Sequence, residues 1–415
     1  MDPSNKPKGP SPHYSLYQRE MFKRGGGHGI MPSFSVHPDE LADSTKRKLN
    51  DHGYFYANSN AGMGWTDRAN REAFYRWRII PRMLVDTNTR DLTTTLFGHK
   101  IPAPILFAPI GINKLYTPKG ELVPAKVAGE LGLPYCLSTA ASNSIEDVAV
   151  ANDEGASVPN ESNSIHAYDG PNGGNPRAKA PRFYQLYAGH DDEVTLSLME
   201  RAWKSGFDVL MFTVDTWQLG WRPTDISLAN YVFYYPPGQI GNENGRSDPV
   251  FMRKYGEQEL QKDSGRWIDT SVWHGKAHTW EKVEWLIKEW KRISGGSPFV
   301  LKGIQNVADA RRAVELGCEG IVVTNHAGRQ VDGAVGSLEV LPEIAEAVGD
   351  KTTIIFDSGI RTGSDVFKAI ALGAHVVEVG RLYVWGMSHD GEHGCRHVMK
   401  SLLAVCIFLF HQSIR

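Results

Sequence analysis

The chain has 415 residues, of which 41% are hydrophobic, and this is enough apolar material for one large domain or for two or three smaller ones. The formal net charge is only −2, which gives no electrostatic support for a general nucleic-acid-binding role. The 4 cysteines are scattered and show no CxxC or Cys/His spacing, so neither a disulfide framework nor a metal site is expected.

The chain begins with a polar, proline-rich segment. Residues 1–35, which include the run Gly25-Gly26-Gly27, are predicted to be disordered or loosely attached. This segment lacks the apolar core of a secretion signal, and the late apolar run at 402–410 is far too short to span a bilayer. The final Ser-Ile-Arg is a poor match to a peroxisomal Ser-Lys-Leu signal. We therefore expect a cytoplasmic protein without a membrane segment.

Two helices are predicted next, one from about Pro38 and one over 67–77. From about residue 103 the pattern changes, and short apolar runs alternate with longer amphipathic segments. Most of these runs are continuously apolar, as is typical of parallel strands that are buried on both faces. The runs cover 105–108, 135–138, 182–187, 209–214, 298–301, 320–323, 353–356 and 375–379.

Helices are predicted between these strands, at 191–205, 280–293, 307–316, 338–348 and 363–372. Three of them are followed by a glycine, Gly317, Gly349 or Gly373, which can cap a helix in the left-handed conformation. Eight such βα units predict an α/β fold, a (β/α)8 TIM barrel with an N-terminal helical extension. An open doubly wound sheet is the alternative.

Two segments interrupt this rhythm. Residues 152–180 are rich in Asn, Gly, Ser and Pro and are predicted to be a surface insertion. Residues 223–268 form a long, aromatic-rich loop after strand 4, in the position of a substrate lid. With these two segments included, the barrel domain is predicted to span 36–415.

Charged residues follow several of the predicted strands, at the ends where a barrel places its catalytic groups. Asp215 follows the fourth strand, Lys302 the fifth and His326 the sixth. Each has an ordinary interpretation by itself, as a helix cap, a rim lysine or a core histidine. Their convergence on one mouth is costly unless they bind a ligand or one another.

The loops after the seventh and eighth strands have the chemistry of a phosphate site. They read Ser358-Gly-Ile-Arg-Thr-Gly363 and Gly380-Arg381, and they offer backbone N–H groups and guanidinium forks. Barrels usually bind phosphate at these two loops.

The segment Thr324-Asn-His-Ala-Gly-Arg-Gln330 resembles the active-site signature of the FMN-dependent 2-hydroxy-acid oxidases and dehydrogenases. The resemblance runs from about residue 53 to about residue 403 and is greatest to the fungal lactate 2-monooxygenase-like branch. It implies a flavoprotein oxidoreductase that binds FMN, oxidises a small (S)-2-hydroxy acid to the 2-oxo acid, and uses oxygen or another electron acceptor. It also implies a homo-oligomer, a tetramer in the family.

The resemblance implies catalytic roles residue by residue. His326 resembles the base, and Asp215 resembles the carboxylate that orients it and stabilises its imidazolium. Arg222 and Arg329 resemble the pair that holds the substrate carboxylate. Tyr187 resembles the residue that hydrogen-bonds the substrate oxygen.

The resemblance also implies a cofactor site. Lys302 resembles the cation beside flavin N1, where reduction deposits negative charge. Ser138, Gln185 and Thr213 resemble residues at the isoalloxazine edge, and Asp357, Arg361 and Arg381 resemble those at the ribityl phosphate end. The remaining predicted cofactor residues are Pro109, Ile110, Thr324, Gly359 and Gly380.

The sequence departs from the family pattern at several positions. An apparent one-residue insertion makes both Tyr54 and Tyr56 candidates for the substrate tyrosine, and we assign Tyr56. Ala327 stands where the signature usually has glycine, and it bears on how close the backbone comes to the cofactor. Ala140 stands where glycolate oxidase has a tryptophan, which implies a wider pocket.

Two other functions fit parts of the pattern. One is another phosphate-binding flavin barrel enzyme, and the other is a catalytically inactive barrel that serves as a binding or structural subunit. The full set of Asp215, Lys302 and His326, with two arginines, favours the 2-hydroxy-acid enzyme. The sequence leaves the particular 2-hydroxy acid and the electron acceptor open.

Overall fold

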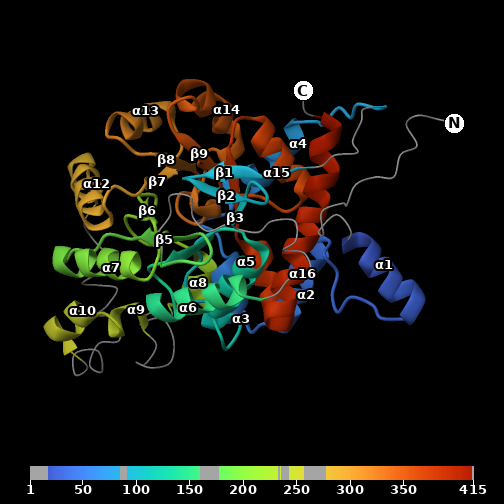
Figure 1. Ribbon diagram of the computed structural model, residues 1–415, viewed down its shortest axis with the longest axis horizontal. Helices are drawn as coiled ribbons and strands as arrows, with labels where there is room; N and C mark the ends of the chain where they lie inside the picture. The colour runs from blue at the N-terminus through green and yellow to red at the C-terminus, as the bar shows by residue number, and fades with distance from the viewer. Residues whose placement is uncertain are drawn as a thin grey trace.

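A closed barrel of eight parallel strands forms the centre of the molecule (Figure 1). The computed structural model describes residues 17–84, 91–158, 177–231, 234, 243–256 and 277–413. The strands follow the order β10-β3-β4-β5-β6-β7-β8-β9 around the barrel, which confirms the predicted fold and excludes an open sheet. They are β3 (Ile105–Phe107), β4 (Tyr135–Ser138), β5 (Arg182–Leu186), β6 (Val209–Thr213), β7 (Phe299–Ile304), β8 (Gly320–Val323), β9 (Thr353–Phe356) and β10 (Val376–Val379).

The strands are apolar throughout because both of their faces are covered. In β9, for example, Ile355 belongs to the apolar cluster inside the barrel, whereas Ile354 and Phe356 belong to the larger cluster between the strands and the helices. This alternation explains why the predicted runs were continuous and why their bounds lay within a few residues of the observed strands.

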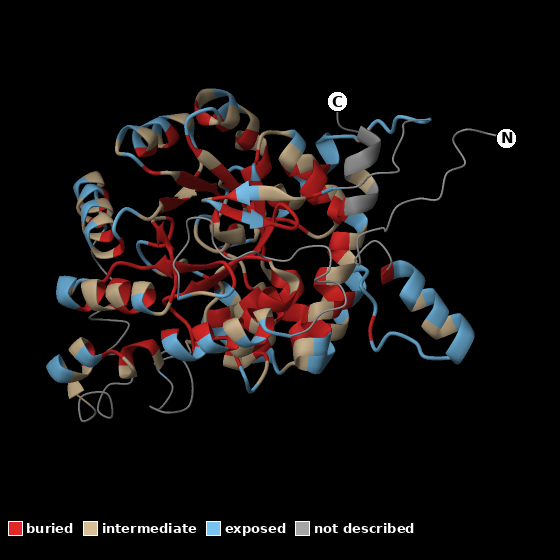
Figure 2. Cartoon of the chain, in the orientation of Figure 1, coloured by how far each residue is buried: buried red, intermediate tan, exposed pale blue. Residues whose placement is uncertain are grey.

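A ring of helices covers the outside of the barrel, and most of these helices bury one face and expose the other (Figure 2). In α12 the buried residues include Val283, Leu286 and Trp290, which share one face. Most of these helices follow the strands they cover in sequence. They are α5 (Leu122–Leu131), α6 (Ile145–Ala156), α7 (Asp192–Lys204), α12 (Trp280–Ser294), α13 (Val307–Glu315), α14 (Ser337–Val348), α15 (Gly363–Ala371) and α16 (Arg381–Ser413).

The predicted glycine caps were right at two of three positions. Gly317 and Gly373 have positive φ angles of 87° and 110°, in the left-handed region. Gly349 does not, because its φ of −65° keeps it in the right-handed region after α14, where its N–H donates to the carbonyl of Ala345.

The base of the barrel is closed by a hairpin that the sequence analysis did not predict. Strands β1 (Thr94–Leu96) and β2 (His99–Ile101) pair in antiparallel fashion, and Phe97 and Gly98 form the turn with φ angles of 49° and 87°. Leu96 and Ile101 pack against the apolar residues inside the barrel.

Four helices precede the hairpin: α1 (Tyr17–His28), α2 (Pro38–Lys48), α3 (Asp51–Asn58) and α4 (Trp65–Arg76). The second half of the segment predicted to be disordered or loosely attached is therefore partly helical, and residues 1–16 lie outside the described part. Attachment comes from few residues: Tyr17 is the buried residue of α1, and its hydroxyl lies 2.6 Å from Nδ1 of His397 in α16.

The two predicted interruptions are only partly described. Residues 152–156 belong to α6 rather than to an insertion, and 159–176 lie outside the described residues. The predicted lid contains α8 (Pro223–Ser227), α9 (Glu243–Arg246) and α10 (Pro249–Lys254), and its remaining residues are mostly outside the described part. Asp248, which caps α10, pairs with Arg201 of α7 and so fixes this segment to the barrel wall.

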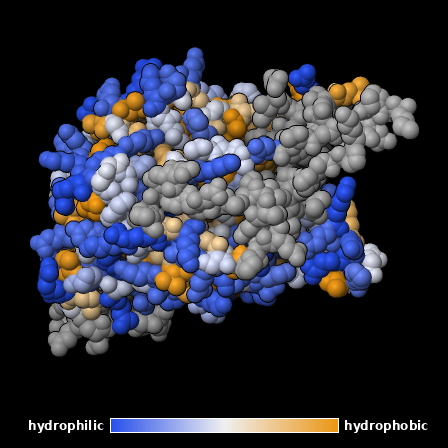
Figure 3. Space-filling view, in the orientation of Figure 1, coloured by the Kyte–Doolittle hydropathy of each residue, from blue (hydrophilic) through white to orange (hydrophobic). Residues whose placement is uncertain are grey.

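The C-terminal segment forms one long helix, α16. Helix α16 runs past α15, α5 and α2, and its backbone departs from helical angles at Asp390 and Gly391. No helix within the described residues is both long and apolar enough to cross a membrane. Mostly polar residues cover the described surface in Figure 3, and apolar residues there form small separate patches.

Candidate active site

A cavity lies at the carboxyl ends of the barrel strands, with about 1040 Å³ of empty space that includes its opening to solvent. Most of the predicted site residues line it. These are Tyr56, Pro109, Ile110, Ser138, Tyr187, Arg222, Lys302, His326, Arg329, Asp357, Gly359, Arg361, Gly380 and Arg381. Three of the other four bond directly to lining residues: Gln185 to Ser138, Asp215 to His326 and Thr324 to Asp357. The fourth, Thr213, bonds to Gln185.

The cavity floor is the uppermost layer of side chains inside the barrel. A floor residue lies two positions after an apolar residue that faces the inside of the barrel. Ser138, for example, follows Cys136 in β4, and Gln185 follows Phe183 in β5. Hydrogen bonds join the layer across three strands. Ser138 Oγ donates to Gln185 Oε1 at 2.8 Å, and Gln185 Nε2 donates to Thr213 Oγ1 at 2.9 Å.

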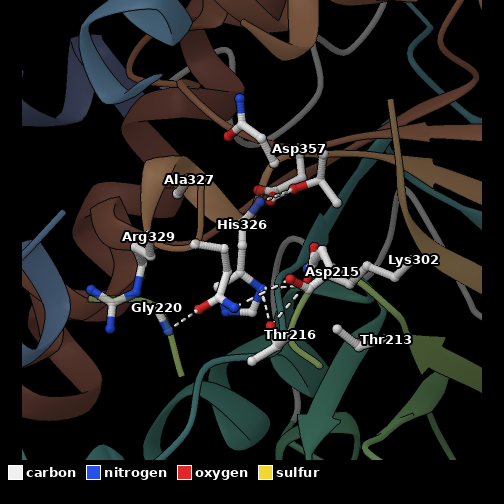
Figure 4. A network of polar contacts seen from close by, with 12 residues as sticks. Thr213, Asp215, Thr216, Gly220, Lys302, His326, Ala327, Arg329 and Asp357 are labelled. Atoms are coloured by element: carbon white, nitrogen blue, oxygen red, sulfur yellow. Dashed lines mark hydrogen bonds and ion pairs between the residues drawn. The ribbon is translucent and has the colours of Figure 1, made fainter. Parts of the chain in front are cut away.

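His326 is held by a carboxylate that also faces a lysine (Figure 4). Nδ1 of His326 lies 2.8 Å from Asp215 Oδ1, and Lys302 Nζ lies 3.5 Å from Asp215 Oδ2. Thr216 Oγ1 donates to Asp215 Oδ1 at 2.8 Å and lies 3.2 Å from the same histidine nitrogen. An ionised carboxylate can only accept, so Nδ1 carries a proton and Nε2 keeps its lone pair.

Burial and charge set the protonation of this triad. Burial alone would raise the pKa of Asp215, but Lys302 and His326 lower it well below its usual value. Burial lowers the pKa of His326, and Asp215 only partly offsets this effect, so the imidazole is neutral near pH 7. The pKa of Lys302 is raised despite burial because Asp215, Asp357 and Glu378 face it. The site therefore holds a neutral base beside a fixed anion and a fixed cation.

The loop that carries His326 has a strained backbone. His326 and Ala327 both have positive φ, 57° and 54°, a region that side-chain-bearing residues rarely adopt. Side chains hold the loop: Thr324 Oγ1 accepts from the His326 N–H at 3.0 Å, and Ser358 Oγ accepts from the Ala327 N–H at 3.0 Å. Such strain persists only where neighbouring groups fix it, and it is frequent at functional sites.

Two arginines and a tyrosine form one wall of the cavity. Arg222 Nε donates to the backbone carbonyl of Arg329 at 2.9 Å, and Arg329 Nη1 donates to the carbonyl of Ser59 at 2.9 Å. The Arg329 guanidinium lies 5.7 Å from the ring centre of Tyr56. Burial, followed by repulsion from Arg329, lowers the pKa of Arg222 to about 9. An anion between the two guanidiniums would relieve this repulsion.

Tyr54 does not appear among the residues that line the cavity. Its ring packs against Phe55, at a centroid distance of 5.2 Å, and Lys46 lies 6.0 Å from it. The structure therefore brings Tyr56, and not Tyr54, to the cavity.

A second pair of arginines, Arg361 and Arg381, also lines the cavity. Arg381 opens α16 and donates to the carbonyl of Ala57 at 2.9 Å and to Asp67 at 3.1 Å. Burial, followed by repulsion from Arg381, lowers the pKa of Arg361 to about 9. Two buried, mutually repelling guanidiniums at a helix amino-terminus fit a doubly charged phosphate.

Sequence reasoning missed several residues of the site. Thr216, Ser358 and Gln330 are polar residues next to predicted ones, and Gln330 Oε1 accepts from Arg222 Nη2 at 3.0 Å. Glu378 lines the cavity from within β10. The signal that could have found it is a single charged residue in the apolar run Val-Val-Glu-Val.

Comparisons with known proteins agree with this geometry. The sequence model of the FMN-dependent dehydrogenase family matches residues 45–404. An FMN-dependent alpha-hydroxy acid dehydrogenase of Penicillium citrinum is 41% identical over 95% of this chain and 91% of its own length. An L-lactate oxidase of Lysinibacillus sphaericus is 35% identical over 88% of this chain and 85% of its own length. A crystal structure of mandelate oxidase is similar with a TM-score of 0.73 and 31% identity, covering 91% of this chain and 94% of that chain.

Proposed function

The chain belongs to the FMN-dependent dehydrogenase family, and from this premise we propose that it oxidises a small (S)-2-hydroxy acid to the 2-oxo acid. The single observation that carries the proposal is His326, a partly buried neutral base whose Nδ1 is fixed by Asp215 at 2.8 Å and whose ring lines a cavity with two arginines. The relatives named above act on alpha-hydroxy acids, L-lactate and mandelate, which share a carboxylate and a neighbouring hydroxyl.

His326 serves as the base. Oxidation of the hydroxyl to a carbonyl removes two protons and two electrons. Nε2 of His326 takes one of the protons, the electron acceptor takes up the two electrons with the other, and the imidazolium that forms is stabilised by the negative charge of Asp215. Asp215 also fixes the tautomer, so that the nitrogen free to accept a proton is always Nε2. Thr216 supports this orientation through its contacts with both groups.

Arg222 and Arg329 bind the substrate carboxylate. Both guanidiniums are tied to backbone carbonyls, so their positions are set before substrate arrives. Tyr56 and Tyr187 line the same part of the cavity, and burial raises the pKa of each, so both phenols stay protonated and can donate to a substrate oxygen. Ala140 leaves this wall of the cavity wide, which favours substrates larger than glycolate.

The residues of the cavity fit FMN. Arg361 and Arg381 would hold its phosphate, Asp357 its ribityl hydroxyls, and the linked Ser138, Gln185 and Thr213 side chains the edge of its ring system. When bound, FMN supplies the two-electron acceptor for the oxidation. Lys302 would supply the positive charge for the part of the ring system that becomes negative on reduction, and the carboxyls around the lysine keep it protonated.

Three finer predictions stay with this proposal. Oxygen or another acceptor removes the electrons, the protein forms a homo-oligomer such as the family's tetramer, and it works in the cytoplasm. They rest on the resemblance and on the composition of the chain.

The test is optical. Purified protein should be yellow, and the flavin absorbance should bleach anaerobically on addition of (S)-lactate or (S)-mandelate but not of their methyl esters, which lack the carboxylate. Protein that carries no flavin and cannot be loaded with FMN, or flavin that no 2-hydroxy acid bleaches, contradicts the proposal. A product assay for peroxide against carbon dioxide then identifies the fate of oxygen.

A further inference from the structure

Glu378 is a buried acid with no hydrogen-bond partner among the described residues. It is 1% exposed, and in the described part of the chain neither Oε1 nor Oε2 has a hydrogen-bond partner. It lies on β10, two residues after Val376, which packs inside the barrel, so it belongs to the same layer as the other floor residues of the cavity. It lines that cavity. A buried carboxyl without partners is costly, and the cavity is the place from which a partner can come.

A second buried glutamate shows what a structural role looks like in this chain. Glu121 Oε1 accepts from the N–H groups of Asn113 and Ser142 at 2.8 and 2.9 Å, and its Oε2 accepts from the Ser142 hydroxyl at 2.7 Å. Glu121 does not line the cavity. Of the two, only Glu378 leaves its polar atoms for a ligand.

The charges around Glu378 decide its protonation. Three carboxyls, Asp215, Asp357 and Glu378, act on the single ammonium of Lys302. Asp215 accepts from His326 and Thr216, and Asp357 accepts from the Thr324 hydroxyl at 2.7 Å. No residue that the structure describes donates to Glu378 in this way. Arg381 also acts on Asp357, so Glu378 is the one of the three carboxyls that has neither a hydrogen-bond donor among the described residues nor a cation of its own, and it is the one that keeps its proton.

The direction of its pKa agrees with this argument. Burial raises the pKa of Glu378 well above its usual value, Asp357 and Asp215 raise it further, and Lys302 opposes them. A carboxyl that stays protonated is a hydrogen-bond donor as well as an acceptor.

We propose that Glu378 is a cofactor-binding residue, a protonated carboxylic acid in the cavity floor that donates a hydrogen bond to bound FMN. The inference rests on the proposed function, because it needs FMN in this cavity. It adds a neutral donor to the floor beside the charged Lys302 and places it on the strand that leads into Arg381.

The opposite charge state has a different consequence. An ionised Glu378 would offset Lys302 and would disfavour any anionic form of the flavin, including its adduct with sulfite. Replacing it with a neutral amide would then strengthen sulfite binding. A protonated Glu378 has the same net charge as an amide, so the same replacement would change little.

The experiment uses the holoenzyme and two variants. Glu378→Gln keeps a neutral donor of similar shape, and Glu378→Leu removes the donor without leaving a cavity. We expect FMN, titrated into deflavinated protein and followed by fluorescence quenching, to bind Glu378→Gln within about twofold of wild type and Glu378→Leu about three- to tenfold more weakly. The sulfite dissociation constant of Glu378→Gln should stay within about twofold of wild type.

Two further measurements separate an effect on FMN binding from an effect on folding. The apo form of Glu378→Leu should melt at a higher temperature than the wild-type apo form, because the variant no longer buries an unpartnered carboxyl. Glu121→Gln is the matched control, and it should lower the melting temperature but leave the FMN dissociation constant within about twofold. If an apo form does not survive deflavination, the FMN lost during dialysis of the holoenzyme replaces the titration.

The outcomes distinguish the two proposals. If wild-type protein does not take up FMN, the proposed function fails first. If wild type binds FMN and Glu378→Leu binds it equally well, Glu378 makes no contact with the cofactor and the inference is wrong. If Glu378→Gln tightens sulfite binding tenfold or more, the carboxyl is ionised and the inference is also wrong.

Discussion

The two ends of the barrel use the same strands for opposite purposes. At the base, Leu96 and Ile101 of the hairpin pack on an apolar layer that includes Cys136 and Phe183. At the mouth, two residues further along those strands, Ser138 and Gln185 open a layer of polar and charged side chains. Side chains on a strand point inward at every second residue, so the apolar layer and the polar layer are successive inward-facing positions of the same strands.

The difference shows how the fold separates stability from chemistry. The base buries apolar surface, which stabilises the barrel in proportion to its area. The mouth concentrates features that destabilise a fold, including the positive φ of His326 and Ala327, the repelling pairs of arginines and the unpartnered carboxyl of Glu378. We therefore expect substitutions at the mouth to change binding and catalysis, and substitutions at the base to change stability.

The largest effect is expected from His326→Gln. Glutamine keeps much of the shape and hydrogen bonding but cannot take a proton, so flavin reduction by a 2-hydroxy acid should slow by about 10²–10⁴-fold. FMN content and the melting temperature should stay close to wild type. Anaerobic stopped-flow measurement of flavin bleaching gives the rate, and bleaching at the wild-type rate would leave the proposed mechanism without its base.

At the hairpin end of the barrel, Leu96→Ala should lower the free energy of unfolding by about 2–5 kcal/mol, because it removes a buried side chain that packs against the barrel interior. Denaturant unfolding of the FMN-loaded protein measures the loss. Its rate of flavin reduction should match wild type within about twofold. A slowed reduction with unchanged stability would mean that the two ends are not separable.

Arg329→Lys tests whether Arg222 and Arg329 bind the substrate carboxylate. Lysine keeps the charge but not the planar fork, so substrate binding should weaken by about 10–100-fold. The dissociation constant comes from the dependence of the bleaching rate on substrate concentration. Sulfite, which carries no carboxylate, is the control ligand and should bind with little change. Equal losses for both ligands would place Arg329 at the cofactor rather than at the substrate.

The pH dependence should report His326 directly. Burial lowers its pKa from the usual 6.5, so the base remains neutral to a lower pH than a free histidine. Below that pKa, the rate of reduction at low substrate should fall about tenfold per pH unit. Asp215 raises the pKa of His326, so Asp215→Asn should move the pH at which the rate begins to fall to a still lower value. If the wild-type rate already falls at or above pH 6.5, His326 is not the base that controls it.

The smallest effect is expected from Ala327→Gly. Glycine removes the cost of a positive φ, roughly 1–2 kcal/mol, but it also makes the unfolded chain more flexible. We expect a net gain of about 0.5 kcal/mol in the free energy of unfolding. Ala347→Gly, inside α14, is the control and should have the opposite sign. A loss at both positions would mean that the loop is not strained at Ala327.

The barrel was predictable because its signal is local. Continuous apolar runs followed by turns predicted strands such as β8 and β9 at their observed bounds. The β1–β2 hairpin was missed because its strands have only three residues each, too few to show a strand pattern. The glycine of the Phe97-Gly98 turn was the one local sign of a hairpin there. Helix α1 was missed because its glycines and polar residues give no amphipathic pattern, and Tyr17 is the residue that it buries.

The site was predictable where a residue stands at the end of a strand or within the signature segment, as His326 and Lys302 do. Residues that act through another side chain, such as Thr216, were not distinguished by position or type from ordinary loop residues. Glu378 was missed for a different reason, because its place in a strand made it look like part of the core. The arrangement of charges around it needs the three-dimensional structure.

The hairpin at the base also bears on the order of events in turnover. Because Leu96 and Ile101 fill that end of the barrel, substrate, oxidised product and electron acceptor share the mouth and pass the same arginines. If the proposed function holds, the oxidised product keeps its carboxylate, and we expect the same arginines to retain it at the mouth that the electron acceptor must also use. We then expect release of the product to limit how soon the next acid can bind.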